Sequence, residues 1–286
     1  MQYPLAEKIG DPDLLVGRVK EFQDFGKWLA NIPKKLSKSR AILARRKSGK
    51  SAIVQRLFNQ LWTENGAIIP FYYEFGESQI WSPDLAIDYY QTFASHYISF
   101  LERDENLVAN KLYLRQLREY GVANSNKLIV DDVDSLIKNQ KRGLYESMWE
   151  TACSAPDRFA SFDKRRVLVI LEEFQNITQY VYWDKNCQGK PDETMAGRFH
   201  SISESKIAPM LVTGSYAGWL RKVISQYLQR DRLKEIPLSP YLTNEEGLAR
   251  QGPYFHFTKY KIVYGPKIRR TVFLSVYRLI KCAIKS

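Results

Sequence analysis

Short runs of apolar and β-branched residues recur along the chain as far as residue 238, and each is separated from the next by a segment long enough for a helix. The runs occupy residues 41–43, 67–75, 167–171, 209–213 and 233–238. A strand buried on both faces needs a continuous apolar run, and strands that alternate with helices form parallel sheets. The pattern therefore predicts an α/β fold with three layers, in which helices cover both faces of a central parallel sheet.

Amphipathic spacing predicts helices between these strands. Residues 19–30 and 51–62 each fit one helix, and the stretch 84–163 fits several, because Leu, Ile, Tyr and Phe recur there at intervals of three and four. Pro83 is typical of the first turn of a helix, and Ser135 is expected to begin another helix.

The chain of 286 residues shows no internal repeat and no low-complexity linker. A chain of this length can bury a large core, and we expect one domain over residues 1–245. From residue 246 aromatic residues alternate with Lys and Arg almost without acids. Residues 246–286 are therefore expected to form a separate basic, aromatic tail, to which the pattern assigns no fold.

The chain is strongly basic, with a formal net charge of +12 and a pI near 9.4. Lys and Arg cluster at residues 34–46, 221–234 and 259–285. Such a surplus attracts polyanions such as nucleic acid, but solvated surface charge explains it equally well. The three cysteines lie too far apart to suggest a disulfide framework or a zinc site. No secretory signal or apolar stretch of membrane-spanning length is found, so we expect a cytoplasmic protein without a membrane span.

Residues 44–51 have the pattern of a phosphate-binding loop. A predicted strand enters this loop and a predicted helix leaves it, so backbone N–H groups and the helix N-terminus would surround a triphosphate, most simply that of ATP. Lys50 is expected to reach the β- and γ-phosphates, and Ser51 to offer its hydroxyl to Mg²⁺. Ala44 replaces the first glycine of the pattern, which mainly eases a tight turn, so no phosphate donor is lost. The candidate nucleotide-binding residues of the loop are Ala44, Arg45, Arg46, Lys47, Ser48, Gly49, Lys50 and Ser51.

Two adjacent carboxylates, Glu172 and Glu173, follow the apolar run 167–171. Adjacent residues at the carboxyl end of a buried strand can take different tasks, and we assign Glu172 to the Mg²⁺ ion and Glu173 to the base that activates water. A pair of acids at a strand end is by itself also typical of a solvated turn. The tyrosine pair Tyr72-Tyr73 is expected only to pack against the sheet.

These motifs together resemble the AAA+ superfamily, specifically the archaeal and bacterial ATPase group allied to the STAND signalling ATPases. The resemblance covers residues 14–245. Gly17 and Arg18 are similar to the family's Gly-Arg box, which borders the adenine pocket, although a turn followed by a helix accounts for the same residues. The loop 44–51 is similar to the family's Walker A motif.

The rest of the resemblance lies in the second half of the chain. The strand that ends in Glu172 and Glu173 is similar to Walker B, where the family usually has Asp followed by Glu. The resemblance implies that Thr213 or Ser215 senses the γ-phosphate and that Arg232 stabilises the transferred phosphoryl group, whereas a strand-ending turn and a surface ion pair are the simpler alternatives. The family's helical lid is not recognisable, so the tail is either a truncated or a diverged lid.

The predicted function is ATP binding with Mg²⁺-dependent hydrolysis, coupled to a conformational change or to signalling. One alternative is a nucleotide-gated regulatory module with little turnover, and another is a nucleic-acid-binding protein of a mobile element or defence system. A protein partner or self-association would accompany either nucleotide-dependent role.

Overall fold

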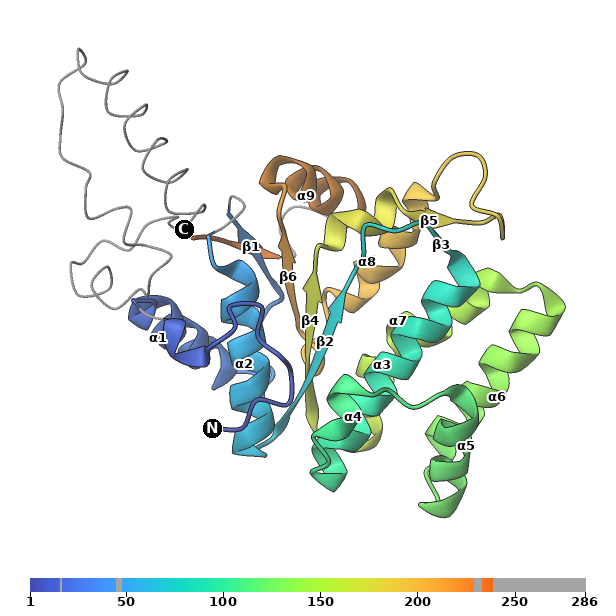
Figure 1. The fold of residues 1–286 in the computed structure, drawn as a ribbon, viewed down its shortest axis with the longest axis horizontal. Helices are drawn as coiled ribbons and strands as arrows, with labels where there is room; N and C mark the ends of the chain where they lie inside the picture. Colours follow the sequence, from blue (N-terminus) through green and yellow to red (C-terminus); the bar gives the residue numbers. More distant parts are fainter. Residues whose placement is uncertain (16, 45–47, 229–232, 239–286) are drawn as a thin grey trace, which may run out of the picture.

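The computed structural model describes residues 1–15, 17–44, 48–228 and 233–238. Its main sheet has five strands in the order β2-β4-β6-β1-β7 (Figure 1), and every pairing between them is parallel. The strands are β1 Arg40–Leu43, β2 Ile68–Glu74, β4 Arg166–Glu172, β6 Met210–Gly214 and β7 Lys234–Pro237. Each strand coincides with one of the five apolar runs, and the predicted fold class is confirmed.

Strand β6 lies between β1 and β4. Leu43 of β1 pairs with Gly214 of β6, and Leu171 of β4 pairs with Val212 of β6. Because parallel strands end at the same edge of a sheet, the segments that follow β1, β4 and β6 converge. This edge therefore receives the loop after β1 and the two carboxylates at the end of β4.

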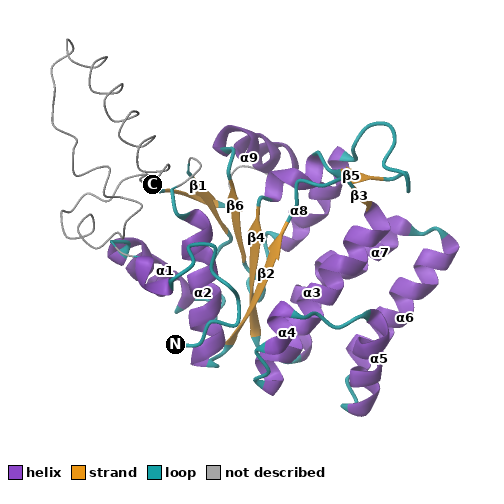
Figure 2. Ribbon diagram, viewed as in Figure 1, coloured by secondary structure: helices purple, strands orange, loops and turns teal. Residues whose placement is uncertain are grey.

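Helices cover both faces of the sheet (Figures 1 and 2). On one face lie α1 Val19–Leu29 and α2 Lys50–Glu64, and on the other lie α3 Ser82–Glu102 and α7 Tyr145–Phe162. A helical pair packs outside α3 and α7 as an additional layer, and the remaining α-helices are short. These elements are α5 Leu114–Ala123 and α6 Lys127–Arg142, followed by α4 Asn106–Ala109, α8 Phe199–Ile202 and α9 Ala217–Val223. Among the described helices, none has both the length and the apolar character needed to cross a membrane.

Aromatic side chains fix β2 against α3 and α7. The ring of Phe71 meets those of Tyr89 and Phe93 edge-on, with centroid distances of 5.1 and 5.2 Å, and Phe93 meets Phe159 at 5.1 Å. All four side chains are buried. Edge-to-face aromatic pairs stabilise a core by about 0.5–1.5 kcal/mol each beyond the burial of their area. This seam fixes β2 against the two helices, and the pairing of β2 with β4 places Glu74 beside Glu172.

Two features differ from the predictions. Ser135 does not begin a helix, because α6 already starts at Lys127, where the side chain of Asn126 accepts a hydrogen bond from the Ile129 N–H and caps the helix. A small second sheet of β3 Ile80–Trp81 and β5 Val181–Tyr182 was not predicted. Two-residue strands have no periodicity that a sequence pattern can reveal.

The buried imidazole of His96 makes stability depend on pH. Its Nδ1 accepts a hydrogen bond of 3.4 Å from the Tyr72 N–H, and burial lowers its pKa from 6.5 to about 4. Between these two pH values the unfolded chain binds the proton more readily, so the free energy of unfolding falls as the pH falls. We expect a loss of about 2 kcal/mol between pH 7 and pH 5. Urea unfolding at both pH values should show a smaller loss for His96→Gln, and an equal loss in both proteins would contradict the assignment.

Candidate functional site

The loop after β1 lies at the convergence of the strand ends and is followed directly by α2. Lys50 is the first residue of α2, is buried, and donates a hydrogen bond of 3.1 Å from Nζ to the Ala44 carbonyl. Of the predicted loop residues, Arg45, Arg46 and Lys47 lie outside the described part of the chain. The lysine ammonium is therefore held at the mouth of the loop, where a phosphate group could replace the carbonyl as its partner.

The backbone of the loop explains which glycine is needed. Gly49 has φ of 80°, a left-handed conformation that glycine adopts freely and that a side chain would strain. Ala44 is not among the described residues with positive φ, so an alanine fits at this position. The effect of this replacement on phosphate binding stays a prediction.

Arg18 ties the segment before α1 to the phosphate loop. Its guanidinium donates to the Ser48 carbonyl at 2.8 Å and to Glu21 at 2.6 Å, and the side chain is buried. Gly17, just before it, has φ of 74°, which lets the chain turn into α1. Of the two residues predicted to border the adenine pocket, Arg18 contacts the loop backbone, and Gly17 precedes it in the chain.

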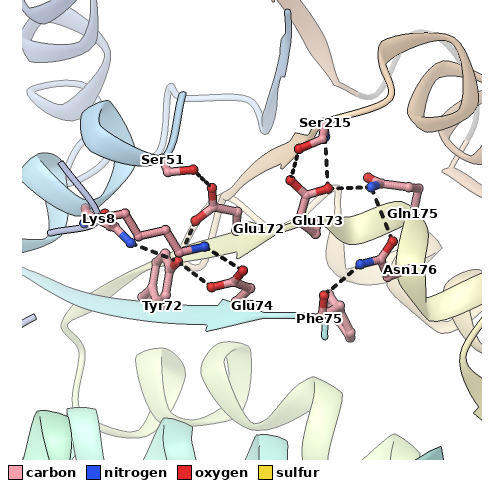
Figure 3. Close-up of polar contacts among 11 residues, drawn as sticks. Lys8, Ser51, Tyr72, Glu74, Phe75, Glu172, Glu173, Gln175, Asn176 and Ser215 are labelled. Atoms are coloured by element: carbon pink, nitrogen blue, oxygen red, sulfur yellow. Dashed lines mark hydrogen bonds and ion pairs between the residues drawn. The ribbon is translucent and has the colours of Figure 1, made fainter. Parts of the chain in front are cut away.

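Glu172 lies at the centre of the site. Its Oε1 accepts a hydrogen bond from the Ser51 hydroxyl and its Oε2 accepts one of 2.5 Å from the Tyr72 hydroxyl (Figure 3). The residue is only 1% exposed, and this burial raises its pKa, whereas the two hydrogen bonds and the charge of Lys8 oppose the rise. The two residues assigned to Mg²⁺ from the sequence, Ser51 and Glu172, are therefore in direct contact.

A hydrogen-bond network that the sequence did not reveal lies behind Glu172. Gln55 Nε2 donates to the Tyr72 hydroxyl at 3.3 Å, and Gln55 Oε1 accepts from the Lys8 N–H at 2.8 Å. The Lys8 ammonium forms an ion pair of 2.6 Å with Glu74, and this contact together with the charges of nearby carboxylates raises the Lys8 pKa in spite of burial. The N-terminal segment thereby contributes to the site. The interpretation of Tyr72 as a packing residue alone is wrong.

Tyr72 fixes the side chain of Glu172 through the hydrogen bond from its hydroxyl. Its pKa is raised well above the ordinary value by burial and by the charges of Glu172 and Glu74, so the hydroxyl remains protonated and can donate. We predict that Tyr72→Phe weakens the Mg²⁺-dependent part of nucleotide binding about 10-fold or more, because a hydrogen bond to a charged group stabilises by about 1.5–3 kcal/mol. Titration of ATP with and without Mg²⁺ measures that part.

The neighbouring tyrosine provides the matched control for this prediction. Tyr73 is as buried as Tyr72, but its hydroxyl donates to Asp88 of α3 at 2.8 Å. Tyr73→Phe should leave the Mg²⁺ dependence unchanged. Equal effects of the two substitutions would mean that Tyr72 acts only through packing.

Glu173 faces the turn after β6. Its carboxylate accepts hydrogen bonds from the Ser215 hydroxyl, from the Ser215 N–H at 2.9 Å and from Gln175 Nε2 at 2.6 Å (Figure 3). Partial burial acts to raise its pKa, but these donors and the charge of Lys50 outweigh burial, and the net result is a lowered pKa. The backbone of Glu173 has φ of 52°, a conformation that is uncommon for a residue with a side chain and that is often found at functional sites.

Thr213, in β6, and Ser215, just after β6, were the two candidates for sensing the γ-phosphate, and they occupy different surroundings. Ser215 contacts Glu173, whereas Thr213 is 0% exposed and its hydroxyl has no hydrogen-bond partner in the described part of the chain. Between them, a Cβ on Gly214 would collide with the Gln175 side chain, so glycine lets Gln175 approach Glu173. The role assigned to Thr213 stays a prediction, and Arg232 lies outside the described residues.

The donor set at Ser51 and Glu172 fits a magnesium ion. Mg²⁺ prefers oxygen ligands and is usually held by one or two protein groups together with phosphate oxygens and water. One hydroxyl and one buried carboxylate at the end of the phosphate loop supply that set. Among the described residues, no cluster of three or more His, Cys, Asp or Glu could hold a metal by itself, so an ion here would depend on the phosphates.

No family model and no curated protein matches the chain. Similar solved structures include a Walker-type ATPase of Pyrococcus abyssi, with 14% identity, a TM-score of 0.45, and coverage of 82% of this chain and 56% of that one. They also include the ORC1 protein of Aeropyrum pernix in complex with DNA, with 12% identity, a TM-score of 0.43, and coverage of 80% of this chain and 47% of that one. The chain thus spans about half the length of these structures. At such values the likeness is no evidence of function, and the fold class rests on the strand order and on the helices that cover both faces of the sheet.

Proposed function

We propose that this protein binds ATP with Mg²⁺ and hydrolyses it slowly. The observation that carries the proposal is the convergence of a phosphate loop, a hydroxyl-carboxylate pair and a second, ionised carboxylate at one edge of a parallel sheet. Lys50 would move from the Ala44 carbonyl to the phosphates, and Ser51 and Glu172 would hold the ion. When bound, Mg²⁺ would offset the negative charge that the phosphates carry.

Glu173 is the proposed base. Its lowered pKa keeps it ionised at neutral pH, so it can accept a proton from the attacking water. Ser215 would orient Glu173, and the buried ammonium of Lys50 would balance the charge between carboxylate and phosphate. Glu173, Ser215 and Lys50 all lie near the carboxyl ends of the strands.

The occupied carboxylate of Glu173 favours little basal turnover. Three hydrogen bonds and the charge of Lys50 stabilise its ionised form, which makes Glu173 a weak base, and they leave a water molecule one acceptor position, on Oε1. We therefore propose a nucleotide-gated module in which release of these donors, on contact with a partner or a second copy, sets the rate. Membership of the AAA+ superfamily, the alliance with STAND ATPases and a cytoplasmic location belong to the same proposal.

Gln175→Ala tests whether the donors restrain Glu173. The substitution removes one of three donors and leaves the two from Ser215, so we predict a several-fold rise in basal phosphate release at unchanged ATP affinity. Gln179→Ala is a suitable control, because Gln179 is exposed and its side chain makes no hydrogen bond in the described part of the chain. A fall in the rate of the Gln175 variant would show that the donors orient the base for catalysis.

Phosphate release by the purified protein tests the proposed reaction. We expect slow release of phosphate from ATP that requires Mg²⁺ and ceases when the ion is chelated. Release no faster than the spontaneous rate, at ATP concentrations that saturate the protein, would remove hydrolysis from the proposal and leave nucleotide binding in place.

A further inference from the structure

The amino ends of the strands, at the edge of the sheet away from the phosphate loop, carry an unusual concentration of basic residues. The turn before β1 contributes Lys34, Lys35 and Lys38, all exposed, and β1 itself begins with the half-buried Arg40. The Arg40 guanidinium stacks over the Trp28 ring at 4.8 Å. Burial lowers the Arg40 pKa, and the charge of nearby Asp24 opposes the decrease.

The neighbouring strands add cations to the same edge. Lys164, Arg165 and Arg166 precede or begin β4, Lys206 lies before β6, and Lys234 begins β7. Of these five residues, all but Arg166 are exposed. We call the nine basic residues of the two groups the amino-end basic surface.

Hydrogen bonds hold the four segments of this surface together. Arg166 donates to the Pro33 carbonyl at 3.5 Å, which joins the turns before β4 and β1. Ser39 accepts a hydrogen bond of 3.0 Å from the Lys234 N–H on its carbonyl and one of 3.0 Å from the Met210 N–H on its hydroxyl. The cations are therefore carried by turns fixed to the sheet.

The charge of this surface is only partly offset within the described residues, where Asp24 of α1 lies near Arg40. Its segments contain three acids, Asp163, Glu204 and Glu235; Asp163 accepts a hydrogen bond from Tyr97 and Glu235 pairs with Arg221. None of the nine cations belongs to an ion pair in the part of the chain that the structure describes. An array of unneutralised cations attracts an extended polyanion more than a single phosphate.

We propose that the amino-end basic surface binds the sugar-phosphate backbone of duplex DNA. The cations lie on four neighbouring strands, β4-β6-β1-β7, and three spacings of about 4.8 Å give a width of about 14 Å. The major groove is about 12 Å wide, so cations on the outer strands can approach phosphates on both sides of it. This contact needs no pocket and no element that contacts the edges of the bases, and binding should be independent of the base sequence of the DNA.

Two other partners fit the surface less well. A single-stranded nucleic acid would need a row of aromatic side chains for stacking, and the turns of the surface are flanked by one exposed aromatic residue, Phe162 at 58%. An interfacial membrane contact would need a continuous apolar face, whereas Leu36, 70% exposed, and Phe162 lie on separate turns.

The test compares two variants that lose the same charge. Lys34, Lys38 and Arg165 are exposed, and their side chains make no hydrogen bond or ion pair in the described part of the chain, so replacing all three by Gln should not disturb the fold. Lys138, Lys141 and Arg142 are exposed on the distant helix α6 and serve as the matched control when replaced by Gln. Thermal unfolding checks both proteins, and if the surface variant is destabilised, its three single substitutions take its place.

Fluorescence anisotropy with a labelled duplex of arbitrary sequence, from about 0.05 to 0.2 M salt, provides the readout. A plot of the logarithm of the association constant against the logarithm of the salt concentration has a negative slope. Loss of three phosphate contacts should reduce the magnitude of this slope by about two to three, and each single substitution should account for about one. The control should bind like the unaltered chain. Nucleotide affinity should be the same in all three proteins, so this proposal and the proposed function can fail separately.

Three results would overturn the proposal. One is an unaltered chain that does not bind the duplex even at low salt, and another is equal binding by the surface variant and the control. The third is sedimentation with phosphatidylserine vesicles that the surface substitutions abolish while duplex binding persists, which would make the surface a membrane contact.

Discussion

Lys50→Ala is expected to weaken ATP binding by about 10²-fold. The Lys50 ammonium lies at the mouth of the loop, and it can form charge-assisted hydrogen bonds with phosphate oxygens. A hydrogen bond to a charged group stabilises by about 1.5–3 kcal/mol, and the lysine can make more than one. Isothermal titration with ATP measures the loss directly.

Two controls distinguish loss of the phosphate contact from damage to the fold. Lys20→Ala removes the same charge from the exposed side of α1 and should leave ATP affinity unchanged. Thermal unfolding of Lys50→Ala without nucleotide should match that of the unaltered chain within a few degrees. ATP affinity that survives the substitution in a folded protein would place the triphosphate elsewhere.

Glu173→Gln is expected to abolish hydrolysis while ATP and Mg²⁺ still bind. The amide keeps the size of the carboxylate but cannot accept a proton, and loss of a general base lowers a rate by about 10²–10⁴-fold. Single-turnover phosphate release measures the chemical step, and a binding titration in the same buffer measures affinity. The amide oxygen can still accept from Ser215, so the local backbone should persist.

Substitution of the adjacent residue, Glu172, is expected to give a contrasting result. Glu172→Gln removes the charge that faces Ser51, so we expect it to reduce the effect of Mg²⁺ on nucleotide affinity. Glu173→Gln should leave that effect intact. If both variants lost Mg²⁺ dependence and turnover to the same degree, the assignment of separate tasks to the two carboxylates would be wrong.

The sequence predicted the sheet because burial on both faces forces a continuous apolar run. All five runs became strands, and the phosphate loop lies between β1 and α2 as its pattern indicates. Helix starts were harder to predict. Ser135 lies inside α6 because the apolar periodicity begins earlier and Asn126 provides the cap.

The support around Glu172 could not be predicted from local patterns. The Lys8 ammonium reaches Glu74 across 66 positions, and Tyr72 reaches Glu172 across 100. These contacts depend on the register of β2 against β4, in which Glu74 pairs with Glu172. A tyrosine in an apolar run looks the same in the sequence whether its ring only packs or its hydroxyl also donates a hydrogen bond. The direction in which the hydroxyl points follows only from the pairing of the strands.

Of the residues that donate to Glu173, the sequence pointed to Ser215 but not to Gln175. Ser215 was one of two candidates on its strand, and the structure brings it to Glu173 and leaves Thr213 buried. Gln175, the third donor to Glu173, lies two residues after it in the chain, and the sequence pattern assigned it no role. It reaches the carboxylate because Gly214 leaves room for it.

A nucleotide titration with and without Mg²⁺, followed by thermal unfolding, tests the central claim most directly. Saturating ATP should stabilise the protein by about 2–3 kcal/mol at a concentration near 100 times the dissociation constant, and Mg²⁺ should lower the concentration required. ADP and GTP, measured alongside, define the preference for the γ-phosphate and for the base. No stabilisation by any of the three nucleotides, with or without Mg²⁺, would contradict the assignment of this loop as a nucleotide site.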